Sequence, residues 1–254
     1  YAFSGSEGGF TLDNFVQMGG YASVFGRSFK LALIATAICL LVGYPVSYLL
    51  SREGERFRRT AMVLIMLPMW MNFLLRTYSW MTILENNGLL NQLFQHLGII
   101  ALYNRITGSN LEYFTMIDTQ GAVVLGMVYN FIPFMILQIH TSLAKMDKSL
   151  LEAANDLGAT PVQAFLRVTL PLSLPGVISG ITLVFLPAVS SFFIPKLLGG
   201  GQFVLVGNII ESQFLTSGDW NFGSAISLIM AIIIMLSMWL TRKVDVQPAS
   251  RGKE

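Results

Sequence analysis

Five apolar stretches constrain the fold of this chain more than any other feature. They cover approximately residues 28–50, 60–84, 119–143, 170–194 and 222–241. Each is close to the roughly 20 residues that a helix needs to cross a bilayer core. Lipid offers the backbone no hydrogen-bond partners, and long, non-alternating apolar runs do not suit a closed barrel. The sequence therefore predicts an all-α fold, a polytopic membrane helix bundle in which residues 1–254 form a single transmembrane domain.

The composition agrees with this fold class and excludes others. The chain is 54% hydrophobic and only 12% charged, whereas about a quarter of the residues are charged in soluble domains. A formal net charge of +2 is too small to indicate a nucleic-acid partner, so we expect none. Cys39 is the single cysteine and excludes an internal disulfide.

Prolines interrupt four of the five stretches. Proline removes a backbone hydrogen bond and kinks a helix unless neighbouring groups compensate. Kinked helices suit a bundle with a path through it, but they also occur in bundles that merely pack, and both alternatives stay open. The prolines are Pro45, Pro68, Pro133, Pro175 and Pro187.

The distribution of Lys and Arg predicts the orientation, because these residues are retained on the cytoplasmic side. Three connections carry eleven of them and are expected inside: Arg52, Arg56, Arg58, Arg59, Lys145, Lys148, Arg167, Arg242, Lys243, Arg251 and Lys253. The other side has five: Arg27, Lys30, Arg76, Arg105 and Lys196. The C-terminus is then cytoplasmic and residue 1 is outside. Since residues 1–15 contain no initiator Met and no apolar signal sequence that would export them, we expect one further helix upstream, six in all.

No motif for catalysis or metal binding stands out. His96 and His140 have no second His, Cys or carboxylate at metal-ligand spacing, so no metal site is expected. A glycine-rich phosphate loop, a nucleophile elbow and paired catalytic carboxylates are missing from the sequence. We therefore expect a protein that is not itself an enzyme and binds no cofactor.

A polar segment at about residues 145–171 stands out in this apolar chain. Ser149 and Glu152 have the spacing of a capping box, and Gly158 is placed to end the helix that starts there. Thr160, Pro161 and Gln163 repeat the start signal. The segment therefore predicts an elbow, which we define as two short helices joined at Gly158.

The elbow offers acidic and apolar groups to a partner. Glu152 and Asp156 lie one helical turn apart, beside an apolar side formed by Leu150, Leu151, Ala153, Ala154 and Leu157. An amphipathic hairpin on the membrane surface is the alternative. Such a helix is normally rich in Lys and Arg, so the acidic pair favours a protein partner with basic residues and an apolar cleft.

The spacing within this segment resembles a known motif. Glu152-Ala153-Ala154, three residues, Gly158, nine residues and then Val168-Thr169-Leu170-Pro171 is similar to the EAA loop of ABC importer permeases, with Val168 where that motif has Ile. The resemblance implies a type I importer permease whose loop docks on a separate ATP-hydrolysing subunit. The residues that it assigns to coupling are Glu152, Ala153, Ala154, Asp156, Leu157, Gly158 and Ala159.

Further stretches narrow the resemblance to permeases of spermidine/putrescine importers, and to the first of their two permease subunits. These are residues 11–15, 33–50, 67–91 and 218–225. The resemblance implies a bacterial inner (plasma) membrane location among lipid, and a heterodimer with a second permease. It also implies two copies of an ATP-binding subunit, with ATP and Mg²⁺ bound there, and an extracytoplasmic polyamine-binding protein.

Several residues are candidates for the substrate path. Aromatic faces can hold protonated amines weakly, and polar groups within a span are rare and often functional. The candidates are Trp70, Asn72, Arg76, Tyr129 and Trp220. The aromatic residues could equally be interface anchors or core filler, and Asn72 and Arg76 could satisfy backbone groups near Pro68. No carboxylate lies well inside a span, which favours weak, transient contacts.

Other functions remain as alternatives: a permease for another small solute, a self-contained channel or secondary transporter, or a membrane scaffold. A secondary transporter should have ionisable residues within its spans or inverted repeats with broken helices, and the sequence indicates neither. A scaffold would leave the proline-rich spans unexplained.

Overall fold

The computed structural model describes residues 1–3, 9–147 and 149–245, and within them it is helical with no β-strand. Four helical segments are long and apolar enough to cross a membrane: Asp13–Arg52, Gln120–Ala144, Pro161–Ser190 and Trp220–Trp239. A pair of helices separated by a short break raises the number of candidate spans to five if the pair is counted as one span. The predicted all-α class is confirmed. Lys148, Arg251 and Lys253, which entered the orientation argument, lie outside the described residues.

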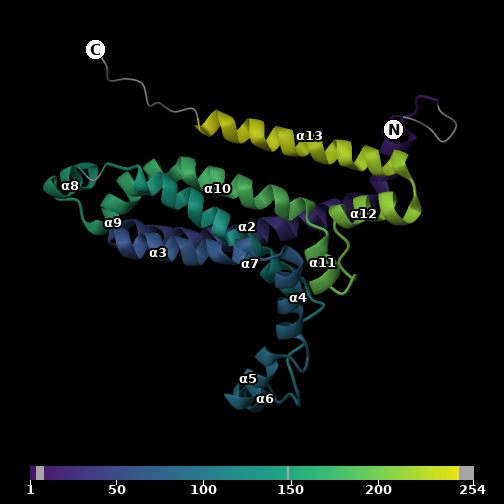
Figure 1. Cartoon of the computed structure of the whole chain (residues 1–254), viewed down its shortest axis with the longest axis horizontal. Coiled ribbons are helices and arrows are strands. Elements are labelled where there is room, and N and C mark those ends of the chain that lie inside the picture. Colours follow the sequence, from purple (N-terminus) through teal and green to yellow (C-terminus); the bar gives the residue numbers. More distant parts are fainter. Residues whose placement is uncertain (4–8, 148, 246–254) are drawn as a thin grey trace. The chain divides into compact units, whose positions relative to one another are not determined.

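The longer elements are labelled in Figure 1. The helices, in chain order, are α1 (Asp13–Gln17), α2 (Ala22–Arg52), α3 (Glu55–Met66), α4 (Phe73–Leu84), α5 (Leu89–His96), α6 (Ile99–Thr107), α7 (Gln120–Ala144), α8 (Ser149–Asp156), α9 (Pro161–Ala164), α10 (Leu170–Ser190), α11 (Phe193–Leu198), α12 (Val206–Ser212) and α13 (Trp220–Asp245). Short 3₁₀ turns cover Met18–Tyr21 and Leu67–Trp70, and π-helical turns cover Phe165–Thr169 and Gln213–Ser217.

The second predicted span, 60–84, is not one helix. α3 ends at Met66, a 3₁₀ turn containing Pro68 follows, and α4 starts after Asn72. The Asn72 side chain accepts a hydrogen bond from the Leu74 backbone N–H at 2.8 Å and so caps a new helix. By contrast, α2 and α7 continue through Pro45 and Pro133. A proline together with a capping residue therefore breaks the helix where a proline alone does not.

The chain forms two compact units. Unit 1 comprises Tyr1–Ala35, Met69–Asn130 and Ala188–Leu228, and unit 2 comprises Thr36–Pro68, Phe131–Pro187 and Ile229–Glu254. The long helices contribute residues to both units, whereas α4, α5, α6, α11 and α12 belong to unit 1 and α3, α8 and α9 belong to unit 2.

Glycines let three helices of unit 2 approach closely. The buried Met135 of α7 lies against Gly43 of α2 and Gly180 of α10. Gly176 of α10 lies against Ser142 and the Gln138 carbonyl oxygen of α7. Small residues of this kind drive helix association in membranes, where burying apolar surface gains little.

A buried hydrogen bond adds to this packing in unit 2. The Ser47 hydroxyl of α2 donates to the Ile136 carbonyl oxygen of α7 at 3.0 Å. Ile136 itself lies about one helical turn after Pro133 in α7. The bond gives a buried polar side chain its partner, as a membrane interior requires.

Unit 1 is held together by side chains that satisfy backbone groups. The buried Ser28 hydroxyl accepts a hydrogen bond from the Val206 backbone N–H at 2.9 Å, which joins α2 to the start of α12. Asn91 is buried and braces the loop after α6, because its side chain donates to the Phe114 carbonyl at 3.0 Å and accepts from the Phe114 N–H at 2.9 Å.

Gly126 of α7 lies directly against Ile194 and Leu198 of α11.

Candidate functional site

The elbow begins at Ser149, but a different residue satisfies its first backbone group. Ser149 is the first residue of α8, and its backbone N–H donates to Asp147 Oδ1 at 3.0 Å. Hydrogen bonds from the Ser149 backbone and side chain lower the pKa of Asp147 below its ordinary value of 3.8. The predicted helix start is right, whereas the predicted pairing of Ser149 with Glu152 is replaced by this contact with Asp147.

Gly158 ends α8 in the left-handed conformation, with φ +77°. The Ala159 N–H donates to the Ala154 carbonyl at 3.0 Å, and the Gly158 N–H donates to the Asn155 carbonyl at 2.9 Å. This pair of bonds is a Schellman motif, which satisfies carbonyls at a helix end. A side chain with a Cβ resists this conformation, so the turn depends on glycine.

The second half of the elbow has the predicted capping box. The Gln163 N–H donates to the Thr160 hydroxyl at 3.3 Å, and the Thr160 N–H donates to Gln163 Oε1 at 2.9 Å. Pro161 occupies the first turn of α9. We expected a second short helix ending near Pro171, but α9 continues through the π-helical turn Phe165–Thr169 into α10. The elbow is therefore a direct extension of a membrane span.

Aromatic contacts fix the base of the elbow to α2 within unit 2. The Phe165 ring packs edge-on against Tyr48 at 5.2 Å and Tyr44 at 5.8 Å between centroids. The Tyr44 hydroxyl lies 2.9 Å from Ser173 Oγ, and Arg52 Cζ lies 4.5 Å from the centre of the Tyr48 ring. Sequence reasoning missed this anchor, because the rings lie more than a hundred positions from Phe165 and share no local pattern with it.

The outer surface of the elbow is open and partly apolar. Leu157 is 88% exposed, and the Glu152 and Asp156 side chains are also exposed. A hollow of about 280 Å³ lies inside the elbow and is lined by Ala154, Leu157, Gly158, Ala159, Gln163, Ala164, Arg167 and Val168. The predicted coupling residues Glu152, Ala153, Ala154, Asp156, Leu157, Gly158 and Ala159 lie along α8 and the turn that follows it.

The first three candidates for the substrate path lie where span two is interrupted. Trp70 is 87% exposed at the end of the 3₁₀ turn. Asn72 caps α4, so its side chain satisfies the backbone, which was the alternative to lining a path. Arg76 has its Nε and Nη1 atoms buried without a hydrogen-bond partner among the described residues. A cation in that state within a span is a candidate for function.

Two other candidates lie elsewhere in unit 1. Tyr129 packs edge-on against Trp80, with centroids 5.2 Å apart. Trp220 starts α13, is 57% exposed and packs edge-on against Phe214 at 5.4 Å. Among the described residues, no ring or polar contact joins Trp220 to the other four candidates.

A polar pair that sequence reasoning did not connect lies between α11 and α12. Lys196 counted only as an outside cation, and Glu211 only as a carboxylate outside the spans. Lys196 Nζ lies 2.8 Å from Glu211 Oε1. The residues are fifteen positions apart with a loop between them, so no helical periodicity links them. In the part of the chain that the structure describes, no group of three His, Cys, Asp or Glu side chains could hold a metal ion.

Comparisons of sequence show relatives over nearly the whole chain. The chain is 39% identical over 247 residues to the "Spermidine/putrescine transport system permease protein PotB" of Haemophilus influenzae. The aligned residues make up 93% of this chain and 83% of that protein. It is 38% identical to the protein of the same name from Escherichia coli, and the aligned residues make up 94% of this chain and 86% of that protein.

Solved structures share the fold at low identity. A bacterial alginate ABC transporter, solved in complex with an alginate pentasaccharide-bound periplasmic protein, matches with a TM-score of 0.71 at 16% identity, over 94% of this chain and 85% of that chain. The MetNI methionine ABC transporter matches with a TM-score of 0.62 at 18% identity, over 90% and 96%.

The family assignment rests on the same stretch that holds the elbow and most of the spans. Residues 40–246 match one family of membrane transport proteins. With the two relatives above and the helical fold, this match is decisive: the chain belongs to the binding-protein-dependent transport system inner membrane component family.

Proposed function

We propose that this chain is a permease subunit of an ATP-driven importer and forms part of the translocation path for spermidine and putrescine. The observation that carries the proposal is the 39% identity, along 93% of the chain, to a permease named for spermidine/putrescine transport. The low-identity structures support the fold alone. A permease for another small solute is the second candidate.

The proposed assembly follows from the family and from the surface of the elbow. A second permease subunit completes the membrane part, and an extracytoplasmic binding protein delivers the polyamine. Two copies of a separate subunit bind and hydrolyse ATP with Mg²⁺. In this arrangement the C-terminus and the elbow face the cytoplasm, as the distribution of Lys and Arg suggests.

In this proposal the elbow couples transport to ATP hydrolysis. The exposed Leu157 enters an apolar cleft of the ATPase, while Glu152 and Asp156 meet basic residues at its rim. The Schellman turn at Gly158 keeps α8 at a fixed angle to α9. Because α9 runs on into α10, movement of the docked elbow reaches a membrane span directly.

The substrate meets only weak sites along the proposed path. Trp70, Tyr129 and Trp220 offer aromatic faces to protonated amines, and each such contact is worth about 0.5–2 kcal/mol. Asn72 caps α4 through its side-chain oxygen, so only its amide nitrogen is available to line the same path, together with Arg76. Weak contacts favour release, which a transporter needs as much as binding.

The test compares wild-type and variant complexes, purified with their partners and reconstituted in vesicles. Gly158→Val forces a β-branched residue into φ +77°, which costs about 1–2 kcal/mol. Glu152→Lys reverses the charge offered to the ATPase. Gly54→Val is the matched control, because Gly54 has φ −62° and open space where a Cβ would lie.

We expect ATP-dependent uptake of spermidine and putrescine by the wild type and by Gly54→Val. Gly158→Val and Glu152→Lys should keep their place in the membrane but lose uptake and its link to ATP hydrolysis. Uptake without ATP would indicate a channel or secondary transporter. Normal transport by both elbow variants would show that the elbow is not the coupling element.

A further inference from the structure

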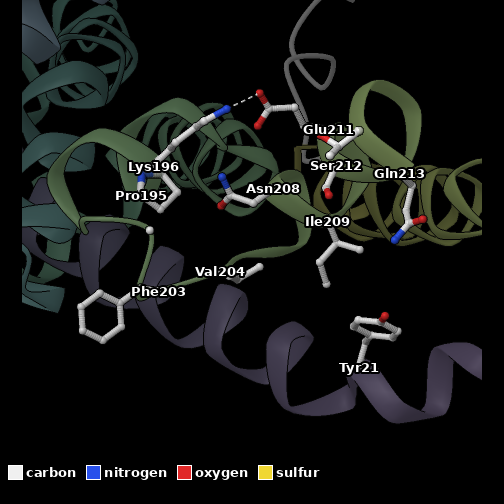
Figure 2. Close-up of a pocket in the computed structure, with 12 residues that line it drawn as sticks. Tyr21, Pro195, Lys196, Phe203, Val204, Asn208, Ile209, Glu211, Ser212 and Gln213 are labelled. Atoms are coloured by element: carbon white, nitrogen blue, oxygen red, sulfur yellow. Dashed lines mark hydrogen bonds and ion pairs between the residues drawn. The ribbon is translucent and has the colours of Figure 1, made fainter. Parts of the chain in front are cut away.

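A cavity of about 420 Å³ lies in unit 1 around the ends of α11 and α12. Its size is within the range of about 300–1,000 Å³ that is typical of small-molecule sites. Figure 2 shows Lys196 and Glu211 joined on one side of it and Tyr21 on the other. The π-helical turn Gln213–Ser217 supplies part of the wall, and such turns frequently occur at functional sites.

The two ends of the Lys196–Glu211 ion pair are not equally covered. The Glu211 side chain is only 17% exposed, whereas the Lys196 side chain is 55% exposed. Lysine is a compact cation on a flexible stem, so its ammonium can move into water by rotating that stem. A largely covered carboxylate needs a cation close by. Glu211 therefore stays in the cavity and requires a partner, whereas Lys196 is replaceable.

Polar groups around Glu211 divide into fixed and available ones. The Asn208 side chain is fixed, because it donates to the Phe192 carbonyl at 2.8 Å and accepts from the Leu205 N–H at 3.1 Å. The side chains of Ser212, Gln213 and Thr216 have no hydrogen bond to any described residue. These three line the cavity and can accept hydrogen bonds from an added donor.

We propose that this cavity binds one protonated primary amine of a linear polyamine, and that the amine takes the place of Lys196 Nζ on Glu211. The proposal rests on the proposed function and adds a substrate site to it. The ion pair itself indicates the ligand class, since Lys196 presents to Glu211 the same primary alkylammonium group that ends a polyamine chain.

The exchange keeps the charges balanced. Before binding, Glu211 is neutralised by Lys196. After binding, it is neutralised by the substrate amine, while Lys196 becomes hydrated. The Tyr21 ring lines the cavity and can contact a further methylene or ammonium group of the ligand. Because Lys196 competes for the same carboxylate, the substrate is held weakly and can leave toward the membrane path.

A purely structural role for the ion pair is the alternative, in which it braces α11 against α12. Four variants of the reconstituted complex separate the two roles: Glu211→Gln, Lys196→Gln, the double exchange Lys196→Glu with Glu211→Lys, and Glu112→Gln. The last is the matched control, an exposed carboxylate in the same unit with no ion pair among the described residues. The assay is ATP-dependent uptake of labelled putrescine and spermidine, normalised to the amount of assembled complex.

We expect Glu211→Gln to reduce uptake about tenfold, which corresponds to about 1.4 kcal/mol. Lys196→Gln should lower the polyamine concentration that gives half-maximal uptake, because the carboxylate then has no competing ammonium. The double exchange should lose uptake although it restores an ion pair, since it puts an ammonium group at position 211. Glu112→Gln should behave as the wild type.

Three results would overturn the proposal. Rescue by the double exchange, or a loss in Lys196→Gln as large as that in Glu211→Gln, would make the pair a brace. Equal uptake by Glu211→Gln and Glu112→Gln would show that the cavity takes no amine. The proposed function is tested separately by the wild type: if it imports neither polyamine, the function fails and the substrate assignment falls with it.

Discussion

Replacing Gly176 by alanine should destabilise unit 2 because the added methyl group has no room. A Cβ at Gly176 would overlap Ser142 Cβ and lie 2.7 Å from the Gln138 carbonyl oxygen. The second neighbour is backbone within a helix, so it cannot rotate away. Forcing extra atoms into a packed interior costs about 1–3 kcal/mol, and a rigid neighbour puts Gly176→Ala in the upper part of that range.

Two other glycines provide matched comparisons. At Gly180 the nearest atom is Met135 Sδ at 2.7 Å, the flexible end of a side chain, so Gly180→Ala should cost less. At Gly26 of α2 nothing lies within 4 Å of the added Cβ. Gly26→Ala should be neutral or stabilising, since alanine is favoured over glycine within a helix by about 0.5–1 kcal/mol.

The assay is the thermal melting temperature of the detergent-solubilised complex, followed by the loss of its size-exclusion peak. For a chain of this length, 1 kcal/mol shifts Tm by about 2–4 °C. Gly176→Ala should therefore melt about 4–12 °C below the wild type, with Gly180→Ala between it and Gly26→Ala. Equal melting of Gly176→Ala and Gly26→Ala would refute the close contact between α7 and α10.

The other predictions concern the elbow, the path and the orientation. Hydrogen bonds lower the pKa of Asp147 below its ordinary value of 3.8. The stabilisation they give is therefore complete at pH values above 3.8 and is lost as the pH falls through the lowered pKa. The amides of α8 should therefore exchange hydrogen faster in Asp147→Ala than in the wild type at pH 7, and the difference should shrink as the pH falls below 3.8. Changing Trp70 and Tyr129 to leucine should reduce polyamine uptake, because each ring lost removes a cation–π contact worth about 0.5–2 kcal/mol. Co-purification of the ATPase should be unaffected. Unchanged uptake would assign both rings to packing. A cysteine at Glu55 should be labelled only from the cytoplasm and one at Arg105 only from outside, and the reverse pattern would overturn the orientation.

Local patterns allowed much of the fold to be predicted from the sequence. The apolar stretches placed four of the five spans on long helices, and the Thr160–Gln163 spacing predicted a capping box that the structure contains. Gly158 was expected to end the first helix of the elbow and does so, with a positive φ. These features depend on residues a few positions apart, where spacing determines which groups meet.

One local break and the contacts between distant residues could not be predicted. The break in span two needed Asn72 to cap a new helix, and a single proline was an insufficient signal because α2 and α7 pass through theirs. The Phe165 anchor and the Lys196–Glu211 pair join residues that only the folded chain brings together. Local pattern therefore predicted the elbow, whereas its attachment and the cavity required the structure.

The position of Met135 between Gly43 and Gly180 also determines how the three helices can move. Methionine is unbranched and has several rotatable bonds, so it can refill a changing gap by changing rotamer. The glycines present no side chain that would have to pass over it. Small sliding steps of α7 past α2 and α10 therefore meet low steric barriers, whereas a branched side chain at Met135 would hold them in one register. This contact suits a shear motion, in which packed helices shift without separating.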